Sequence, residues 1–390
     1  GGTSVGTIPR IQNVADRVLK DKASGQKPVV VVSAMAGETN RLVALANEML
    51  PLSRGAAYDM LLATGEQASV ALTVLAFEKA GAKARPYLAH QLGIRTDSMF
   101  SRARIQSIET KQILADIENG IIPVVAGFQG IDENGNVTTL GRGGSDTSAV
   151  AIAAALKLST CEIYTDVPAV FSADPRLVPK AREMSHLSFE EMLEMASLGS
   201  KVLHSRSVEM GAKHGVKIHL RSTFETREGT WVVPEGEAME NAIVSSVTHE
   251  ASTCIVNISP IGEDTDALAE LFEELAREGI VIDVISQTDV DRLAFSVGDE
   301  DREFARQIAQ KEFPKAKVTL KENVSKVTII GVGMRTHPGV AATFFRTLAK
   351  NDVDVHLVTT SEIKVSAIID KEKLQTAAQS LHTAFGLDAK

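Results

Sequence analysis

The part of the chain after residue 241 contains the same pattern twice. Residues 280–287 read Ile-Val-Ile-Asp-Val-Ile-Ser-Gln, and residues 353–360, 73 positions later, read Val-Asp-Val-His-Leu-Val-Thr-Thr. Each of these strand-like runs follows a segment with helical periodicity, at residues 264–277 and 339–350. A helix followed by a strand, repeated at this spacing, predicts two copies of one small α+β domain.

The two copies differ in how they end. The first reads βαββαβ over residues 252–320, the order of a ferredoxin-like domain. The second reads βαββα over residues 326–385 and lacks a final strand. Residues 242–248 are predicted as a strand before the first copy, and we expect this strand to complete the second sheet. The second domain is therefore predicted as residues 242–248 plus 326–385.

The first part of the chain, residues 1–233, alternates short β-branched runs with longer helical segments. This alternation is typical of α/β domains in which helices cover a sheet. Residues 234–241 lose all periodicity and are predicted as a linker. A capping box at Ser188 and Glu191 predicts a helix start, and Asn134-Gly135 between residues 130–131 and 137–140 predicts a hairpin turn. The predicted helices include residues 40–49, 58–79, 103–119 and 145–158, and the predicted strands include 29–32, 84–88, 121–126, 161–165, 217–221 and 230–233.

Composition limits the class of protein. A chain of 390 residues with 44% hydrophobic and 23% charged residues fits two or three folded domains. The net charge of −9 argues against a nucleic-acid or anionic-membrane partner. Cys161 and Cys254 lie in separate apolar runs, so we expect both to be buried thiols in a reducing compartment. No apolar run approaches a membrane span and no leader pattern is present at Gly1, so we expect a cytoplasmic protein.

The strongest chemical signal is a glycine turn between a predicted strand and a predicted helix. Residues 139–148 read Thr-Leu-Gly-Arg-Gly-Gly-Ser-Asp-Thr-Ser. Glycines let the backbone approach an anion, and the N-terminus of the following helix presents free N–H groups and the positive end of its dipole. Arg142 between the glycines is suited to binding a carboxylate or phosphate with two hydrogen bonds. A flexible turn followed by a helix cap is the simpler interpretation, and we favour the anion site over it.

Several motifs together resemble the aspartate kinases. They are Gly-Gly-Thr-Ser-Val at residues 1–5, Val-Ser-Ala-Met at 32–35, Thr-Gly-Glu at 64–66, Ala-Gly-Phe at 126–128, the glycine turn at 141–146, Tyr-Thr-Asp-Val at 164–167, Asp-Pro-Arg at 174–176 and Gly-Ser-Lys-Val-Leu at 199–203. The resemblance covers the whole chain, because the duplicated domain is similar to the paired ACT domains of that family. It implies an α/β amino-acid-kinase fold, a three-layer α/β/α sandwich over residues 1–233, followed by two ferredoxin-like ACT domains.

The resemblance also implies an activity and a set of site residues. The activity is ATP-dependent phosphorylation of the β-carboxylate of L-aspartate, feeding lysine, threonine and methionine synthesis. Because that carboxylate is already ionised at neutral pH, catalysis needs alignment and charge neutralisation rather than a general base. Mg²⁺ is expected to arrive with the ATP, since the sequence contains no dedicated metal-ligand cluster.

By motif match, Arg142 would hold the substrate α-carboxylate and Glu66 the α-ammonium, while Asp146 would lie near the transferring phosphoryl group. The simpler interpretations, which we favour less, are a solvated charge for Glu66, a plain helix-start lysine for Lys201 and only a turn for the Asp174–Arg176 motif. The histidines receive no catalytic role. The implied substrate pocket is completed by Ser33, Thr39, Phe128, Gly143, Gly144 and Ser145. The implied ATP site is formed by Gly1, Gly2, Thr3, Thr165, Asp166, Phe171, Asp174, Arg176 and Lys201.

The sequence departs from the family at two places. The family has a Lys followed by Phe or Tyr immediately before its first Gly-Gly, and that lysine bears on the phosphates. The sequence here begins at Gly1, so we expect the polypeptide as written to be weak or inactive. Residues 167–171 read Val-Pro-Ala-Val-Phe, where the family usually has Asp-Gly after the Val and Tyr in place of Phe171.

The resemblance implies feedback inhibition by lysine, threonine or both through the ACT domains. It also implies a homodimer, because ACT domains usually bind their ligands between two copies. The loop at residues 334–340 looks like an effector loop, whereas its counterpart at 259–264 lacks the Pro-Gly pair. The implied effector residues are Asp283, Gln287, Gly339, Val340, Ala341, Asp354, Val355, Ser361 and Glu362.

Other functions are open at the level of sequence. One is another amino-acid kinase, for instance one that acts on glutamate. A second is a non-catalytic amino-acid sensor of the same fold, favoured by the altered residues 167–171. A dinucleotide dehydrogenase is poorly supported, because no Gly-x-Gly-x-x-Gly follows an early strand, and a Walker-type loop is absent.

Overall fold

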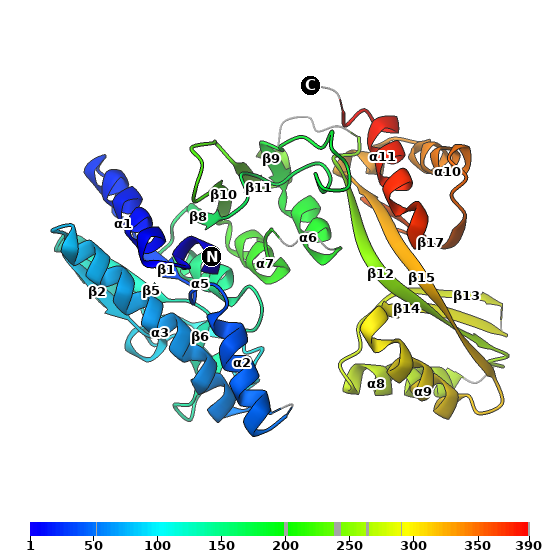
Figure 1. Ribbon diagram of the computed structural model, residues 1–390, viewed down its shortest axis with the longest axis horizontal. Helices are drawn as coiled ribbons and strands as arrows, with labels where there is room; N and C mark the ends of the chain where they lie inside the picture. Colours follow the sequence, from blue (N-terminus) through cyan, green and yellow to red (C-terminus); the bar gives the residue numbers. More distant parts are fainter. Residues whose placement is uncertain (52, 199–201, 238–242, 263–264, 290, 389–390) are drawn as a thin grey trace. The chain divides into compact units, whose positions relative to one another are not determined.

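The computed structural model describes the chain apart from residues 52, 199–201, 238–242, 263–264, 290 and 389–390 (Figure 1). The structure contains two compact units. The first unit comprises Gly1–Val170, Glu183–Ala196 and Lys201–Met239, and the second comprises Phe171–Arg182, Ser197–Ser200 and Glu240–Lys390. The segment Phe171–Arg182 thus lies within the first part of the sequence but packs with the second unit.

The first unit contains a parallel three-stranded sheet in the order β1-β5-β2. The strands are β1 (Val30–Val32), β5 (Ile122–Ala126) and β2 (Ala84–Tyr87). All five residues of β5 are buried. A parallel strand that is covered on both faces reads as a continuous apolar run, which is the pattern of residues 121–126.

Helices cover both faces of this sheet. On one face α1 (Ile8–Ala23) and α3 (Ala56–Lys79) pack against Val124, and on the other α4 (Lys111–Glu118) and α5 (Gly144–Ala155) pack against Val125. Consecutive residues of a strand point to opposite faces, so β5 contributes to both cores. This arrangement confirms the predicted three-layer α/β/α class.

A second sheet of the first unit has the order β8-β10-β11-β9. Its strands are β8 (Thr160–Thr165), β10 (Lys217–Ser222), β11 (Thr230–Val233) and β9 (His186–Ser188). β8 and β10 are parallel, and β11 runs antiparallel to β10. The expected capping box is present at the start of α6 (Phe189–Ser197), where Ser188 and Glu191 exchange hydrogen bonds of 3.1 Å. The following helix, α7 (Ser205–His214), was not predicted.

A third sheet of this unit has the order β4-β3-β6-β7 and includes the expected hairpin. β6 (Gln129–Ile131) and β7 (Val137–Thr139) are antiparallel, and Gly135 in their connection has a φ of 80°. The helix predicted over residues 103–119 is wrong. Residues Ile105–Ser107 form β4, which pairs with β3 (Arg95–Thr96), and α4 begins only at Lys111. Pairing with a neighbouring strand outweighed the helical pattern of these few residues.

The helix α3 has the length and composition of a membrane span, which contradicts the expectation that no stretch of the chain approaches one. A core helix of a folded protein passes the same test. α3 packs against α1 and the first sheet and, with α2 (Glu38–Met49), buries Leu42, Leu62 and Phe128. Asp59 and Glu66 lie on its buried face.

The second unit is built on one six-stranded antiparallel sheet in the order β13-β14-β12-β15-β17-β16. Both copies of the duplicated domain are present, but they share two long strands instead of having separate ones (Figure 1). The strands are β12 (Ser246–Ser259), β13 (Ile282–Asp289), β14 (Arg292–Gly298), β15 (Lys317–Ile330), β16 (Val355–Thr360) and β17 (Lys364–Asp370).

The strand expected to complete the second sheet does so. Residues 246–248 pair with residues 328–330 of β15, and β12 then continues past an irregularity after Glu250 to pair with β14 over residues 253–258. The prediction of two separate strands on either side of residue 250 is therefore wrong, because one bent strand serves both copies. A β-bulge allows such a change of direction without ending a strand.

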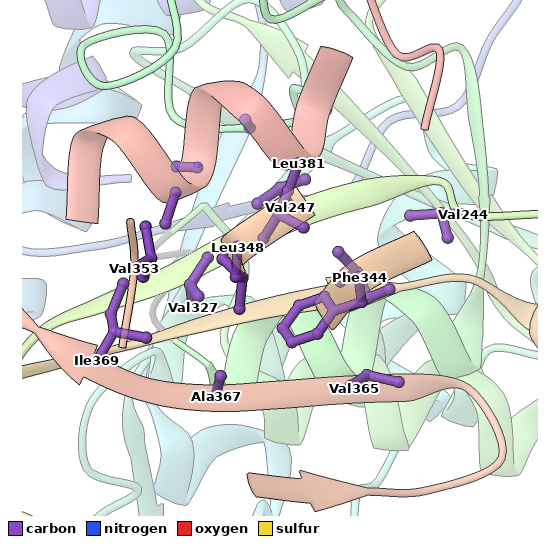
Figure 2. Packing of buried hydrophobic residues seen from close by; sticks show 14 of the residues in the cluster. Val244, Val247, Val327, Phe344, Leu348, Val353, Val365, Ala367, Ile369 and Leu381 are labelled. Carbon is purple, nitrogen blue, oxygen red and sulfur yellow. The ribbon is translucent and has the colours of Figure 1, made fainter. Parts of the chain in front are cut away.

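Each copy has its own helix pair and its own core. Cys254 and Phe295 pack beneath α8 (Thr265–Arg277) and α9 (Arg302–Glu312). Phe344 and Leu381, from α10 (Val340–Lys350) and α11 (Leu374–Ala384), pack onto the other half of the sheet (Figure 2). Both cysteines are free and buried, as expected.

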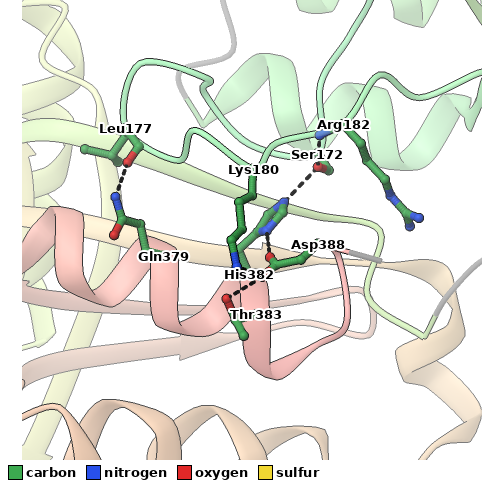
Figure 3. A network of polar contacts seen from close by, with 8 residues as sticks. All are labelled: Ser172, Leu177, Lys180, Arg182, Gln379, His382, Thr383 and Asp388. Carbon is green, nitrogen blue, oxygen red and sulfur yellow. Dashed lines mark hydrogen bonds and ion pairs between the residues drawn. The ribbon is translucent and has the colours of Figure 1, made fainter. Parts of the chain in front are cut away.

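The segment Phe171–Arg182 is built into the core that contains Phe344. Ala173 and Val178 belong to that core. Ser172 Oγ lies 2.8 Å from His382 Nε2, the Ser172 carbonyl accepts from Val247 N at 2.8 Å, and Gln379 donates to the Leu177 carbonyl at 2.9 Å (Figure 3). These buried contacts hold the segment on α11 and β12.

Truncating a core aromatic tests this packing. Phe344 is fully buried, whereas its neighbour Phe345 is 39% exposed. We expect Phe344→Ala to lower the free energy of unfolding by roughly 3–5 kcal/mol, since it removes buried apolar area and leaves a cavity. Phe345→Ala is the matched control and should cost much less. Chemical denaturation of both variants measures the difference, and equal losses would contradict the assigned core.

Candidate functional site

The glycine turn adopts a backbone that requires glycine at two positions. Gly141 has a φ of 80° and Gly143 a φ of 66°. A Cβ on Gly141 would lie 2.8 Å from the Ser101 carbonyl oxygen, and one on Gly143 would collide with the side chain of His204. α5 begins immediately afterwards at Gly144, so its free N–H groups face the turn. Arg142 is exposed at the tip of this turn.

The segment after β5 lies against the start of α5. A Cβ on Gly127 would be 2.8 Å from Ser145 Oγ, and the Phe128 N–H donates to Ser148 Oγ at 3.1 Å. Phe128 has a φ of 69°, an uncommon conformation for a residue other than glycine. Its ring is buried against Leu42 and Leu62. Phe128 therefore borders the predicted substrate pocket through its backbone, and its side chain belongs to the core.

Glu66 is a buried carboxylate that is only half satisfied. Its exposed fraction is 3%, and Oε1 accepts a hydrogen bond from the Ala34 N–H at 3.0 Å. Oε2 has no hydrogen-bond partner among the described residues. Burial raises the pKa of Glu66 to about 7, against the lowering effect of the bond from Ala34. A carboxylate in this state is suited to receiving a cation.

Predicted residues from three motifs line one cavity of about 290 Å³ in the first unit. Gly1, Ser33, Ser145 and Asp146 lie along it, and it extends between the edges of β1 and β8. Burial raises the pKa of the Asp146 carboxyl, which lies in the first turn of α5. Ser33 is followed by Ala34, the partner of Glu66, and Ser145 follows the Arg142 turn. Thr39 lies in the first turn of α2 and does not line this cavity.

The first residues of the chain connect the predicted substrate and nucleotide motifs. Gly1 N donates to the Tyr164 carbonyl at 2.9 Å, at the end of β8. A Cβ on Gly2 would be 2.9 Å from the Ala34 carbonyl oxygen. Residues 1–3 thus lie between the 33–35 loop and the strand that leads to Thr165 and Asp166. Thr165 Oγ1 donates to Asp166 Oδ1 at 3.3 Å.

The remaining predicted nucleotide residues belong to the second unit or lie outside the described residues. Phe171, Asp174 and Arg176 belong to the second unit. There Arg176 is largely exposed and pairs with Asp174 at 2.7 Å, and this contact lowers the pKa of the Asp174 carboxyl. Lys201 lies outside the described residues. A cluster of His, Cys, Asp or Glu able to hold a metal ion is not found in the part of the chain that the structure describes.

The predicted effector residues fall into two groups. Glu362 forms an ion pair of 3.2 Å with Arg335, next to the α10 N-terminus, where Gly339 has a φ of 96°. Gly339, Val340, Ala341, Ser361 and Glu362 form this group.

The second group lies elsewhere. Asp354 and Val355 lie at the other end of the six-residue β16, roughly 20 Å away at about 3.3 Å per residue. Asp283 and Gln287 come from β13, and Asp283 pairs with the buried Lys326. One amino acid cannot contact both ends of β16 within one chain.

Sequence reasoning missed three residues around the glycine turn. His204 was given no role, but its side chain packs against Gly143, and burial lowers its pKa. Arg206 donates to the carbonyl oxygens of Leu140 and Ala103. Asp59 is fully buried and accepts from Thr139 N at 2.6 Å. A sequence signal existed for Asp59, since it precedes Glu66 by seven residues and therefore lies on the same face of α3.

Comparison with known proteins identifies two family patterns. Residues 1–222 match the amino acid kinase family, and residues 327–385 match an ACT domain. The chain is 42% identical over 397 residues to an aspartate kinase of Pseudomonas putida, covering all of this chain and 97% of that protein. It is also 42% identical over 394 residues to aspartokinase 2 of Bacillus subtilis, covering 99% of this chain and 96% of that protein.

Solved structures agree with the sequence relatives. The crystal structure of E. coli aspartokinase III in complex with aspartate and ADP (R-state) matches with a TM-score of 0.83 at 25% identity, covering 98% of each chain. The same enzyme in complex with lysine and aspartate (T-state) matches with a TM-score of 0.81 at 25% identity, covering 99% of this chain and 98% of that chain.

Neutralising Glu66 tests whether its burial is costly. The carboxyl ionises near pH 4.5 when unfolded and near pH 7 when folded, so the folded state binds the proton more tightly and loses stability as the pH rises through that window. We expect Glu66→Gln to raise the free energy of unfolding by up to about 3 kcal/mol at pH 8 and by little at pH 4.5. Glu78→Gln, at an exposed position of the same helix, is the control, and denaturation at both pH values decides.

Proposed function

Because the chain belongs to the aspartate kinase family, we propose that it transfers the γ-phosphoryl group of ATP to the β-carboxylate of L-aspartate, giving 4-phospho-L-aspartate. One observation carries the proposal. The exposed Arg142 turn and the half-satisfied Glu66 carboxylate both lie next to residues that line one cavity. Ser145 follows the turn, and Ala34, which donates to Glu66, follows the lining residue Ser33. An amino acid carries a carboxylate and an ammonium close together, and these two side chains have the complementary charges.

The chemistry requires little acid–base help. The β-carboxylate of aspartate is ionised at neutral pH, so it can attack phosphorus directly, and the enzyme must align it and neutralise charge. Arg142 binds the α-carboxylate, and Glu66 binds the α-ammonium in its ionised form. Burial disfavours the ionised form of Glu66, and the positive charge of the substrate ammonium favours it. Substrate binding therefore lowers the pKa of Glu66. The free N–H groups at the start of α5 are available to the transferring phosphoryl group.

Mg²⁺ would be bound to the ATP and would supply positive charge to its phosphate oxygens. Thr165 and Asp166, at the end of β8, and the glycine segment at residues 1–3 form the nucleotide side of the site. Asp146 lies in the first turn of α5, between this segment and the Arg142 turn. By motif match, Phe171, Asp174, Arg176 and Lys201 are also proposed to contact ATP. The related aspartokinase III has been solved with aspartate and ADP, which supports both ligands.

An Arg142 variant tests the assignment of substrate. We expect Arg142→Ala to raise the KM for aspartate roughly 100-fold, because a charged hydrogen-bonded pair contributes about 1.5–3 kcal/mol. The KM for ATP should change little. Arg41→Ala, which removes an exposed guanidinium paired with Glu38 on α2, is the control. ADP release is measured with a coupled assay on the chain carrying Lys-Phe ahead of Gly1.

The same assay separates the alternatives. Faster turnover with glutamate than with aspartate would assign the chain to another amino-acid kinase. Nucleotide binding without turnover on either substrate would favour a non-catalytic sensor of the same fold. ADP release that depends on aspartate supports the proposal.

The second unit regulates this activity. Lysine, threonine or both bind the ACT pair in a cytoplasmic homodimer and inhibit the first step of lysine, threonine and methionine synthesis. The related aspartokinase III solved with lysine supports an amino-acid effector. Within one chain, the Arg335–Glu362 pair beside the N-terminus of α10 supplies a cation, an anion and free N–H groups. These are the groups that bind a second zwitterion.

The segment Phe171–Arg182 carries the effect of the effector to the nucleotide site. It follows Thr165 and Asp166 in the chain, and its buried contacts are with α11 and β12 of the second unit (Figure 3). A shift of α11 on effector binding therefore moves residues proposed to contact ATP. Two sites joined to one packed element are coupled by whatever free energy each ligand contributes to its position.

A variant on α11 tests this coupling. Gln379 donates to the Leu177 carbonyl, whereas Gln375 on the same helix is exposed. We expect Gln379→Ala to raise the lysine or threonine concentration for half inhibition about threefold to tenfold, the range of a lost hydrogen bond, with basal turnover within about twofold. Gln375→Ala should leave inhibition unchanged. Equal sensitivity of both variants would contradict the proposed route.

A further inference from the structure

Asp59 is a buried carboxylate without a basic partner. It lies in the first turn of α3 and is fully buried. Its Oδ2 accepts from the Thr139 N–H at 2.6 Å and from the Ser101 N–H at 2.9 Å, and its Oδ1 accepts from Ser101 Oγ at 3.1 Å. No Lys, Arg or His contacts it among the described residues. Three donors compensate for the loss of water around the charge.

These donors come from two segments that meet at the glycine turn. Thr139 ends β7, two residues before Gly141, and a Cβ on Gly141 would touch the Ser101 carbonyl oxygen. Ser101 has a φ of 66°, a conformation that a residue other than glycine adopts only where its surroundings hold it. Asp59 holds Ser101 through both its backbone and its hydroxyl. The carboxylate therefore fixes the two segments, at Ser101 and Thr139, that lie against the glycine turn.

A second set of hydrogen bonds joins the same two segments, at residues 101–103 and 139–140. The Ala103 N–H donates to the Thr139 carbonyl at 2.9 Å, and Arg206 donates to the carbonyl oxygens of both Ala103 and Leu140. Thr139 is thus held at its N–H by Asp59 and at its carbonyl by Ala103. Arg142 follows three residues later on this fixed backbone. A displacement of Thr139 would therefore shift the backbone that carries Arg142.

We propose that Asp59 is a positioning residue for substrate recognition, which fixes the Arg142 turn at the distance that suits a four-carbon amino diacid. The proposal rests on the role of Arg142 given above. Acceptor oxygens are needed at this position because the N–H groups of Thr139 and Ser101 both donate to Oδ2. Leucine has a similar size but accepts no hydrogen bond, so Asp59→Leu removes all three contacts. An amide would keep them, because its oxygen accepts from both N–H groups and its N–H₂ group donates to Ser101 Oγ.

The consequence concerns selectivity as well as affinity. If the turn is released, the separation between Arg142 and Glu66 is no longer fixed. The site then loses affinity for aspartate and discriminates less against glutamate, which is one methylene longer. A residue that only stabilised the fold would lower the melting temperature without changing this ratio, because the remaining folded molecules would keep an intact site.

The test compares two buried carboxylates in the full chain. Asp116 is also buried, but its partners are Tyr87 and Arg85 and not the segments that hold the turn. We expect Asp59→Leu to raise the KM for aspartate at least about tenfold, to leave the KM for ATP within about twofold and to lower the aspartate-to-glutamate ratio of kcat/KM about fivefold or more. Asp116→Leu should lower the melting temperature but change neither KM nor the ratio.

The outcomes separate this inference from the proposed function. If Arg142→Ala raises the KM for aspartate and Asp59→Leu does not, Asp59 only stabilises the fold and the inference is wrong. If neither variant changes that KM, the proposed role of Arg142 fails first. Should Asp59→Leu not fold, Ser101→Gly decides, because glycine keeps the N–H and the positive φ but removes the hydroxyl bond. An unchanged KM and ratio in Ser101→Gly would then overturn the inference.

Discussion

Two carboxylates buried on one face of an apolar helix are the constraint on which the first unit depends. Asp59 and Glu66 lie seven residues apart on α3, and each must replace the water that it lost on folding. Asp59 does so completely, with three hydrogen bonds from the segments beneath the glycine turn. Glu66 does so only in part. Its Oε1 accepts a hydrogen bond from the Ala34 N–H, and its Oε2 has no partner among the described residues. The satisfied group gives a fixed frame, and the unsatisfied group leaves a place for a cation.

In the second unit, two copies of a small domain are joined into one folded body by shared strands. Each copy buries its own helix pair, but β12 and β15 pass through both halves of the sheet. Bending a shared strand costs less backbone pairing than ending it and starting another. The core formed by the second copy also takes in Phe171–Arg182. A segment that follows the Thr165 and Asp166 motif in sequence is therefore held by a helix and a strand of the second unit.

The elements that the sequence predicted best are those with a strong local reason to form. The Ser188 capping box, the glycine at position 135 of the β6/β7 hairpin and the apolar run of β5 each have a signal within a few residues. The helix predicted over 103–119 failed because residues 105–107 pair with β3, and that partner lies outside any local window. The single bent β12 was read as two strands for the same reason.

By itself the sequence determined the family and the duplicated domain, and it singled out the candidate site motifs at 33–35, 64–66 and 141–146, because glycine turns and repeated strands give local sequence patterns. Only the tertiary structure decided which residues share a surface. It showed that Phe128 turns its ring into the core, that Phe171 and Asp174 pack with the second unit, and that Asp59 supports the turn. The physical reason is that burial and hydrogen-bond partnership depend on contacts between segments far apart in the chain, which no local pattern records.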